Sequence, residues 1–161
     1  METRFRHAEE LCYVCLWMPS KTSLDRASLQ RLAERYARDA QILLENRAWS
    51  SAYYLAGYAI ECALKACIAR QFRRYQYPDL NTVKEIYIHD LSKLMRIAGL
   101  AGHLLERSQE ADRFGDYWSK IVTGWTERSR YEEPTRAMAI ELVTAVSDTR
   151  EGVLAWIRRY W

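Results

Sequence analysis

Apolar residues recur every three to four positions over most of the chain, which is the spacing of amphipathic helices. The longest such stretch covers residues 48–74, and on a helical wheel its alanines, Leu55 and Cys62 share one side. The opposite side carries longer, mostly polar or aromatic side chains: Tyr54, Tyr58, Glu61, Lys65 and Phe72. A helix that is apolar on more than one side is normally central to its domain, and a seam of small residues lets another helix approach closely. The pattern predicts the central helix of an α-bundle, with Glu61 and Lys65 paired one turn apart.

The same periodicity predicts four further helices, over residues 25–44, 90–99, 103–123 and 135–159. The first has Ser23 or Asp25 as its N-cap. A two-residue turn at 46–47 should fold the central helix back antiparallel to it.

The segments between these helices read as loops at residues 75–81 and 125–133, and as a helical turn or connector at 83–88. No stretch alternates with the period of a strand. The predicted fold class is therefore all-α, an antiparallel helical bundle of about five helices.

The length and composition of the chain indicate a single domain. Of the 161 residues, 23–161 are expected to form the helical domain, and 1–22 an N-terminal extension of uncertain order in which Met18 is an alternative start. No window approaches the 18 apolar residues of a membrane span, and residues 11–18 are too short for a signal peptide. We expect a cytoplasmic protein with no membrane contact.

Charge and cysteines narrow the chemistry only slightly. The net charge is +3, and the basic residues are nineteen arginines against five lysines. Arginine suits phosphate binding, although a compositional bias explains the excess equally well. Cys12 and Cys15 form a CxxC, but Cys62 and Cys67 are five apart on a helix and do not present two thiolates together. We expect reduced, buried cysteines, no metal site and no cofactor.

Histidine chemistry is sparse, because the chain has three histidines and no phosphate-loop, dinucleotide or zinc-protease motif. His89 lies beside Asp90 at a predicted helix start, where it either caps and packs or belongs to a site. His103 begins another predicted helix and could pair with Arg96.

The densest group of candidate binding residues lies in the loop at residues 125–133, where Arg128, Arg130 and Tyr131 precede Pro134. Two guanidinium groups and a phenol can hold phosphate oxygens and stack on a base. They can equally pair with the neighbouring Glu127, Glu132 and Glu133. Arg73 and Arg74 offer a second phosphate contact, or simply suit the end of the central helix.

Three segments occur in an order that resembles a known family. They are the stretch from Tyr53 to Ala66 with Glu61 and Leu64-Lys65-Ala66, then His89-x-Leu91-x-x-Leu94, then Arg130-Tyr131 before the last helix. Together they resemble HEPN domains (higher eukaryotes and prokaryotes nucleotide-binding) over roughly residues 25–157. The resemblance implies an all-α bundle, commonly a homodimer, in a family of RNA- and nucleotide-associated proteins. Some members are metal-independent ribonucleases in toxin–antitoxin or defence systems; others are non-catalytic, and many are encoded beside a nucleotidyltransferase.

The ribonuclease members carry an Arg-x4-6-His motif that this sequence lacks before its last helix, because no histidine follows His103. Arg96 and His103 have the permitted spacing but occur too early. Three hypotheses follow: an RNA- or nucleotide-binding dimer without turnover, a metal-independent endoribonuclease toxin, or a structural helical partner. The tentative catalytic set is His89, Arg130 and Tyr131, and Tyr54, Tyr58, Glu61 and Lys65 are assigned to an interface or structural polar stripe.

Overall fold

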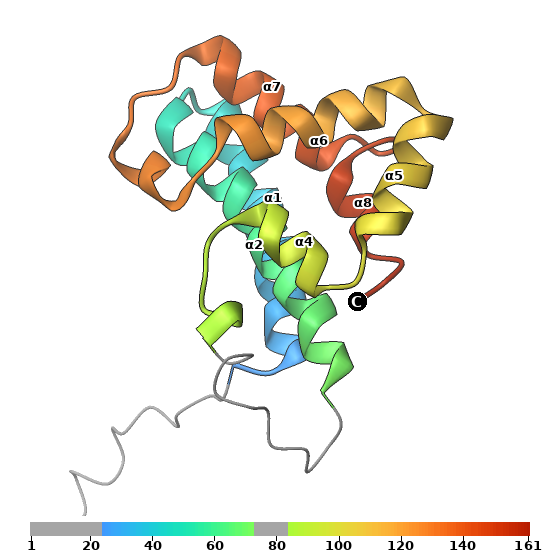
Figure 1. Ribbon diagram of the computed structural model, residues 1–161. Helices are drawn as coiled ribbons and strands as arrows, with labels where there is room; N and C mark the ends of the chain where they lie inside the picture. The colour runs from blue at the N-terminus through green and yellow to red at the C-terminus, as the bar shows by residue number, and fades with distance from the viewer. Residues whose placement is uncertain (1–23, 73–83) are drawn as a thin grey trace, which may run out of the picture.

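The computed structural model describes residues 24–72 and 84–161, and this part of the chain is helical without strands. It begins with a long antiparallel pair, α1 (Arg26–Glu45) and α2 (Trp49–Gln71), at the centre of the molecule (Figure 1). The Asp25 side chain caps α1 by accepting from the Ser28 backbone N–H at 2.7 Å. Asn46 ends the helix, and Arg47, at φ 61°, makes the tight turn. The predicted hairpin is confirmed.

Helix α2 is the core of the bundle, because it is buried along most of its length and packs against α1, α4, α7, α8 and the turn η2. Its small residues lie fully buried, as do those of the facing helix: Ala52, Ala56, Ala59 and Ala63 on α2, and Ala33 and Ala40 on α1. Small side chains allow the two backbones to approach closely. The prediction of one uninterrupted central helix is confirmed over residues 49–71.

A short helix follows on the other side of α2. Residues 84–86 form one helical turn, and α4 (Leu91–Ile97) begins at Asp90, whose carboxylate accepts from the Lys93 backbone N–H at 2.9 Å. The helix ends before Gly99, which has φ 73°. A positive φ favours glycine, and the predicted helix over 90–99 is confirmed.

The helix predicted over residues 103–123 is wrong as a single element. It is two helices, α5 (Ala101–Glu110) and α6 (Asp112–Gly124), separated by Ala111 in an extended conformation. The break redirects the chain so that Phe114 and Ile121 of α6 are fully buried, whereas Leu105 of α5 stays 62% exposed.

The last predicted helix also breaks, into α7 (Arg136–Ser147) and α8 (Val153–Ile157). The Asp148 carboxylate accepts from the backbone N–H groups of Arg150 and Glu151 at 2.8 and 2.9 Å, which stabilises a turn in place of the helix. The break allows Trp156 to pack against Phe114 with ring centroids 5.2 Å apart.

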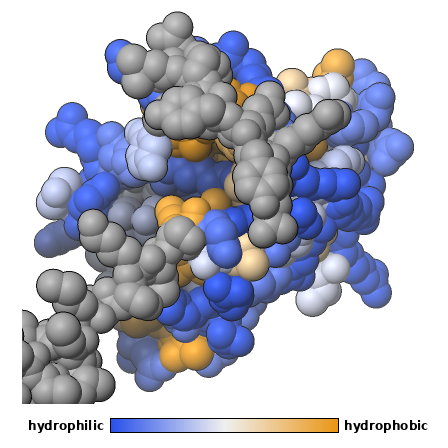
Figure 2. All heavy atoms as spheres, turned by 90° about the horizontal axis from the view of Figure 1, so that it is seen from below, coloured by the Kyte–Doolittle hydropathy of each residue, from blue (hydrophilic) through white to orange (hydrophobic). Residues whose placement is uncertain are grey.

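The far end of the bundle, seen from below, shows a mostly hydrophilic surface with apolar patches (Figure 2). Apolar side chains that include Leu24, Phe72 and Ile86 line a cavity of about 300 Å³. In the ranges 24–72 and 84–161, none of the helices combines the length and apolar character of a bilayer span. The predicted extension over residues 1–22, the cysteines of its CxxC, and Arg73 and Arg74 lie outside the described residues.

Candidate functional site

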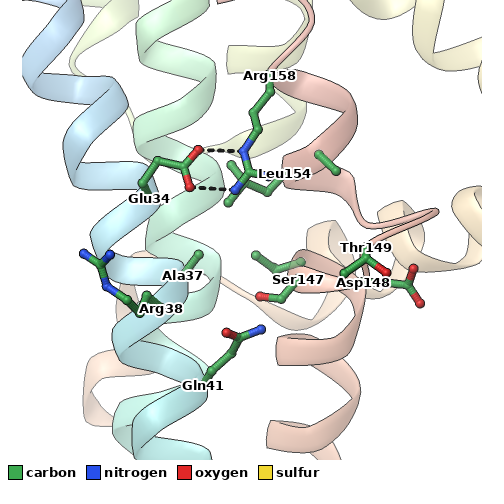
Figure 3. A pocket seen from close by; sticks show the side chains of 11 residues that line it. Glu34, Ala37, Arg38, Gln41, Ser147, Asp148, Thr149, Leu154 and Arg158 are labelled. Carbon is green, nitrogen blue, oxygen red and sulfur yellow. Dashed lines mark hydrogen bonds and ion pairs between the residues drawn. The ribbon is translucent and has the colours of Figure 1, made fainter.

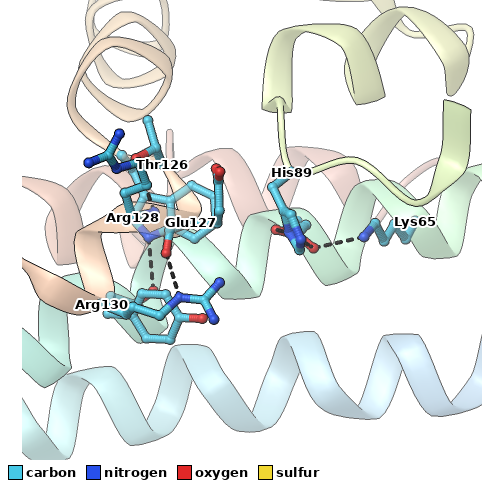
Figure 4. Close-up of polar contacts among 9 residues, drawn as sticks. Lys65, His89, Thr126, Glu127, Arg128 and Arg130 are labelled. Carbon is cyan, nitrogen blue, oxygen red and sulfur yellow. Dashed lines mark hydrogen bonds and ion pairs between the residues drawn. The ribbon is translucent and has the colours of Figure 1, made fainter.

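One side of α2 carries Tyr54, Tyr58, Glu61 and Lys65 in sequence, and two segments distant in the chain dock onto it. The 3-10 turn η2 (Glu127–Tyr131) lies over the Tyr54 end, and the loop before α4 brings His89 to Glu61 (Figure 4). We call this side of α2 the polar stripe. It joins the three sequence segments that resembled HEPN landmarks.

At one end of the polar stripe a carboxylate is nearly buried between two basic groups. Glu61 is 2% exposed and accepts from Lys65 Nζ at 2.8 Å, which confirms the predicted pair. His89 Nδ1 lies 3.0 and 2.9 Å from the two Glu61 oxygens. Because an ionised carboxylate only accepts hydrogen bonds, Nδ1 carries the proton, and Nε2 is the nitrogen left for other partners. A buried charge is costly unless it is paired, and here it is paired twice.

At the other end a guanidinium group lies over an aromatic row. Arg130 Cζ is 5.7 Å from the Tyr54 ring centroid and 5.6 Å from that of Tyr131, both within the range of cation–π attraction. Its Nε donates to the Glu127 carbonyl at 2.7 Å. The arginine is therefore fixed from three directions while it remains exposed.

The aromatic row extends beyond Tyr54. Tyr54 stacks on Tyr58 at 5.7 Å, Tyr58 stacks on Tyr36 of α1 at 5.0 Å, and Arg35 lies over Tyr36 at 5.1 Å. Burial raises the pKa of Tyr54, and it raises the pKa of Tyr58 to about 12, so both phenols keep their O–H donors over the whole physiological range. Sequence reasoning missed Arg35 and Tyr36, because they lie on a different helix and carry no motif.

The position of η2 depends on Trp125, the first residue after α6. Its indole lies against Gly57, where a Cβ would overlap the ring, and its Nε1–H donates to the Tyr54 carbonyl at 3.0 Å. The Tyr53 hydroxyl donates to the Gly124 carbonyl beside it. Thr126 and Ser129 complete a capping box in the turn. A glycine on α2 thus permits the close approach that places Arg130 over the polar stripe.

The structure separates some of the residues that the sequence grouped. Arg128 and Arg130 leave the turn in different directions (Figure 4), so they do not form one phosphate clamp. Tyr131 is 81% exposed. His103 does not pair with Arg96: it lies 3.5 Å from Glu106 and stacks on Tyr160 at 5.0 Å. In the described ranges, Arg128 and Arg130 form no ion pair with Glu127, Glu132 or Glu133.

A cavity of about 630 Å³ opens between the His89 loop and η2. Its apolar lining comes from Ile88, Leu91, Val122 and Trp125, and its polar lining is His89, Asp90, Ser92, Thr126 and Glu127. We call it the His89 cavity. A ligand in this cavity would meet both apolar walls and several polar groups.

A second cavity, of about 410 Å³, lies between α1 and the α7–α8 turn (Figure 3). Arg158 donates to both oxygens of Glu34 at 2.6 Å across its mouth, so these two charges satisfy each other. Ser147 Oγ is buried there without a partner within the described part of the chain. This cavity contains none of the predicted site residues.

The two described cysteines are inert by position. Burial raises the pKa of the Cys62 thiol to about 12 and that of Cys67 to about 11, and both side chains are 3% exposed. A thiol that stays protonated is a weak nucleophile at neutral pH.

The structure is an all-α domain whose central helix carries the polar stripe, with the buried Glu61 paired to Lys65 and His89. Comparison with protein families agrees with the sequence resemblance: the HEPN domain profile matches residues 27–159, and the chain belongs to this family. Membership places the chain among nucleotide- and RNA-associated proteins. Neither a curated protein nor a solved structure matches the chain.

Proposed function

We propose that the chain is an RNA- or nucleotide-binding module, active as a homodimer beside a nucleotidyltransferase or in a toxin–antitoxin or defence system, which binds without cleaving. The observation that carries the proposal is Arg130: its guanidinium is held over Tyr54, stays exposed, and has no carboxylate partner in the described ranges. An arginine placed in this way binds a phosphate without first having to break an ion pair.

The separation of the two ends of the polar stripe supports binding without turnover. Tyr54 and Glu61, which position Arg130 and His89, are seven residues apart, or roughly 10 Å along a helix. General acid–base catalysis needs a group within about 3 Å of the proton that it moves. Arg130 and His89 of one chain are therefore poorly placed to act on the same phosphate.

Binding of a fluorescein-labelled single-stranded RNA, followed by anisotropy over a range of salt concentrations, tests this proposal. Arg130→Ala should weaken binding and lower the slope of log K against log salt by about 0.7, the value for one phosphate contact in a single strand. Arg150→Ala is the matched control, since Arg150 is exposed in the α7–α8 turn. Equal affinities and slopes for the two variants would contradict the proposal.

The homodimer draws support from family membership and from exposed apolar side chains on α7, where Met138 is 45% and Ile140 39% exposed. Light scattering on the purified protein should give twice the chain mass of 19.0 kDa. Met138→Glu should shift the mass toward the monomer. A monomer at all concentrations would refute this part, and co-purification of a co-expressed nucleotidyltransferase would support the partner.

A metal-independent endoribonuclease is the second candidate, favoured by the His89–Glu61 contact. A carboxylate that holds Nδ1 of an imidazole leaves Nε2 able to accept or donate a proton, as general acid–base catalysis requires. This function predicts RNA cleavage in EDTA that is lost in both His89→Ala and Arg130→Ala.

A further inference from the structure

We infer that the His89 cavity is a nucleobase site that selects guanine through the carboxylate of Glu127. The inference rests on the proposed RNA or nucleotide binding and adds the base that the site prefers. The volume of about 630 Å³ lies within the range of small-ligand pockets, which is about 300–1,000 Å³. The walls of Ile88, Leu91 and Val122 suit the apolar faces of a base.

The two acidic groups that line the cavity differ in what they are free to bind. The Asp90 carboxylate is occupied, because it accepts from the Lys93 backbone N–H at 2.9 Å and pairs with Lys93 Nζ at 3.3 Å. The Glu127 carboxylate has no hydrogen bond or ion pair to any residue within 24–72 or 84–161. Of the two carboxylates, Glu127 is therefore the one free to accept hydrogen bonds from a ligand in this cavity.

An ionised carboxylate offers two acceptor oxygens and no donor. Among the four RNA bases, guanine presents two adjacent donors on its pairing edge, N1–H and the N2 amino group, which match those two oxygens. Adenine and cytosine present an amino group beside a ring nitrogen that is itself an acceptor, and uracil presents one N–H between two carbonyls. The free carboxylate of Glu127 thus favours guanine.

The turn that lines the cavity also carries Arg130, the proposed phosphate-binding residue of the polar stripe. Glu127 and Arg130 belong to the same 3-10 turn, and the Glu127 carbonyl accepts from Arg130 Nε at 2.7 Å. Trp125 lines the cavity on one side and stacks with Tyr54 at 6.1 Å, on the row that Arg130 covers. One turn therefore presents an acid for the base and a cation for the phosphate of a bound nucleotide.

Calorimetric titration of the full chain with GMP, IMP, AMP, CMP and UMP tests the inference, because all five share the ribose phosphate. GMP should bind about 10-fold more tightly than AMP, CMP or UMP, the size expected for one bidentate contact, and IMP should fall between them because it lacks the amino donor. Glu127→Gln replaces two acceptors with one acceptor and one donor, and should remove the preference for GMP over AMP. Glu133→Gln, which removes an exposed carboxylate two residues beyond the turn, should keep the preference.

A second measurement separates this inference from the proposed function. Two single-stranded RNAs of equal length, one of uridine alone and one with guanosine at alternate positions, are compared by anisotropy. Equal binding of both RNAs, with the loss in Arg130→Ala retained, would overturn the guanine site and leave the binding function standing. Failure of both RNAs to bind would refute the two together. Displacement of GMP by spermidine at equal concentration would also overturn the inference, because it would show that Glu127 holds a cation.

Discussion

The two ends of the polar stripe on α2 differ in how their charged groups are satisfied. At the Glu61 end a nearly buried carboxylate is satisfied by Lys65 and His89, so its charges are already paired inside the protein. At the Tyr54 end an exposed guanidinium rests on aromatic rings, which attract it without neutralising it. The difference separates stability from binding: the first end should matter for folding, and the second for what the surface can hold.

Removal of the buried carboxylate should have the largest effect. Glu61→Ala leaves Lys65, whose side chain is 16% exposed, without its partner, and should lower the free energy of unfolding by about 3–5 kcal/mol. Urea denaturation measures this. Glu141→Ala, which removes the exposed partner of Lys120, should change it by less than about 0.5 kcal/mol. Similar losses in both variants would mean that the buried Glu61 pair contributes no more to stability than an exposed ion pair.

The second largest effect is expected from a substitution at the contact between α2 and Trp125. Gly57→Ala places a methyl group against the indole and should lower the free energy of unfolding by about 1–3 kcal/mol, with weaker RNA binding because η2 shifts. Gly102→Ala is the matched control: no atom lies within 4 Å of its Cβ position, so helix propensity alone should stabilise the protein by about 0.5–1 kcal/mol. A stabilising Gly57→Ala would show that Trp125 does not fix the turn.

The coupling between Arg130 and Tyr54 should be smaller. A double-mutant cycle of Arg130→Ala with Tyr54→Ala should give an interaction free energy of about 0.5–1 kcal/mol, as expected for an exposed cation–π pair. In a protein that carries Tyr54→Phe, Arg130→Ala should have the same effect as in the wild type, because the aromatic ring remains. If Tyr54→Phe abolishes the interaction with Arg130 as fully as Tyr54→Ala does, the hydroxyl group rather than the ring holds Arg130.

At neutral pH the Cys62 thiol should have no effect on the pH dependence of stability, and an effect should appear only in alkaline solution. The pKa of Cys62 is raised from 9.0 to about 12, so the thiol stays protonated in the folded protein while the unfolded chain releases its proton above pH 9. The contribution is fully present below pH 9 and is lost as the pH rises toward 12. Between pH 8 and 10 the wild-type protein should lose about 1 kcal/mol more stability than Cys62→Ala. Parallel pH profiles would show that the thiol does not titrate differently on unfolding.

The sequence was informative where local physics decides the structure. The cap at Asp25 and the pair of Glu61 with Lys65 each depend on residues three or four positions apart, and each is present. The breaks at Ala111 and Asp148 were missed, because the apolar period continues through both. Phe114 and Trp156, which follow the two breaks, pack against each other, and the Asp148 carboxylate stabilises the second break locally.

The candidate site was only partly accessible from the sequence, because its contacts are long-range. His89 and Glu61 are 28 residues apart, Arg130 and Tyr54 are 76 apart, and Trp125 reaches Gly57 across a similar distance along the chain. The resemblance ordered these segments along the chain without showing that they meet on one helix. Arg35 and Tyr36, on α1, carried no signal that single-sequence reasoning could use.

The central claim is that this HEPN-domain chain holds RNA at the Arg130 end of α2 and leaves it intact. The most direct test incubates labelled single-stranded RNA with the purified protein in EDTA and measures both the bound fraction and the length of the RNA. We predict a salt-sensitive complex, weakened in Arg130→Ala, with RNA of full length. Shortened RNA that is absent with His89→Ala would contradict the claim.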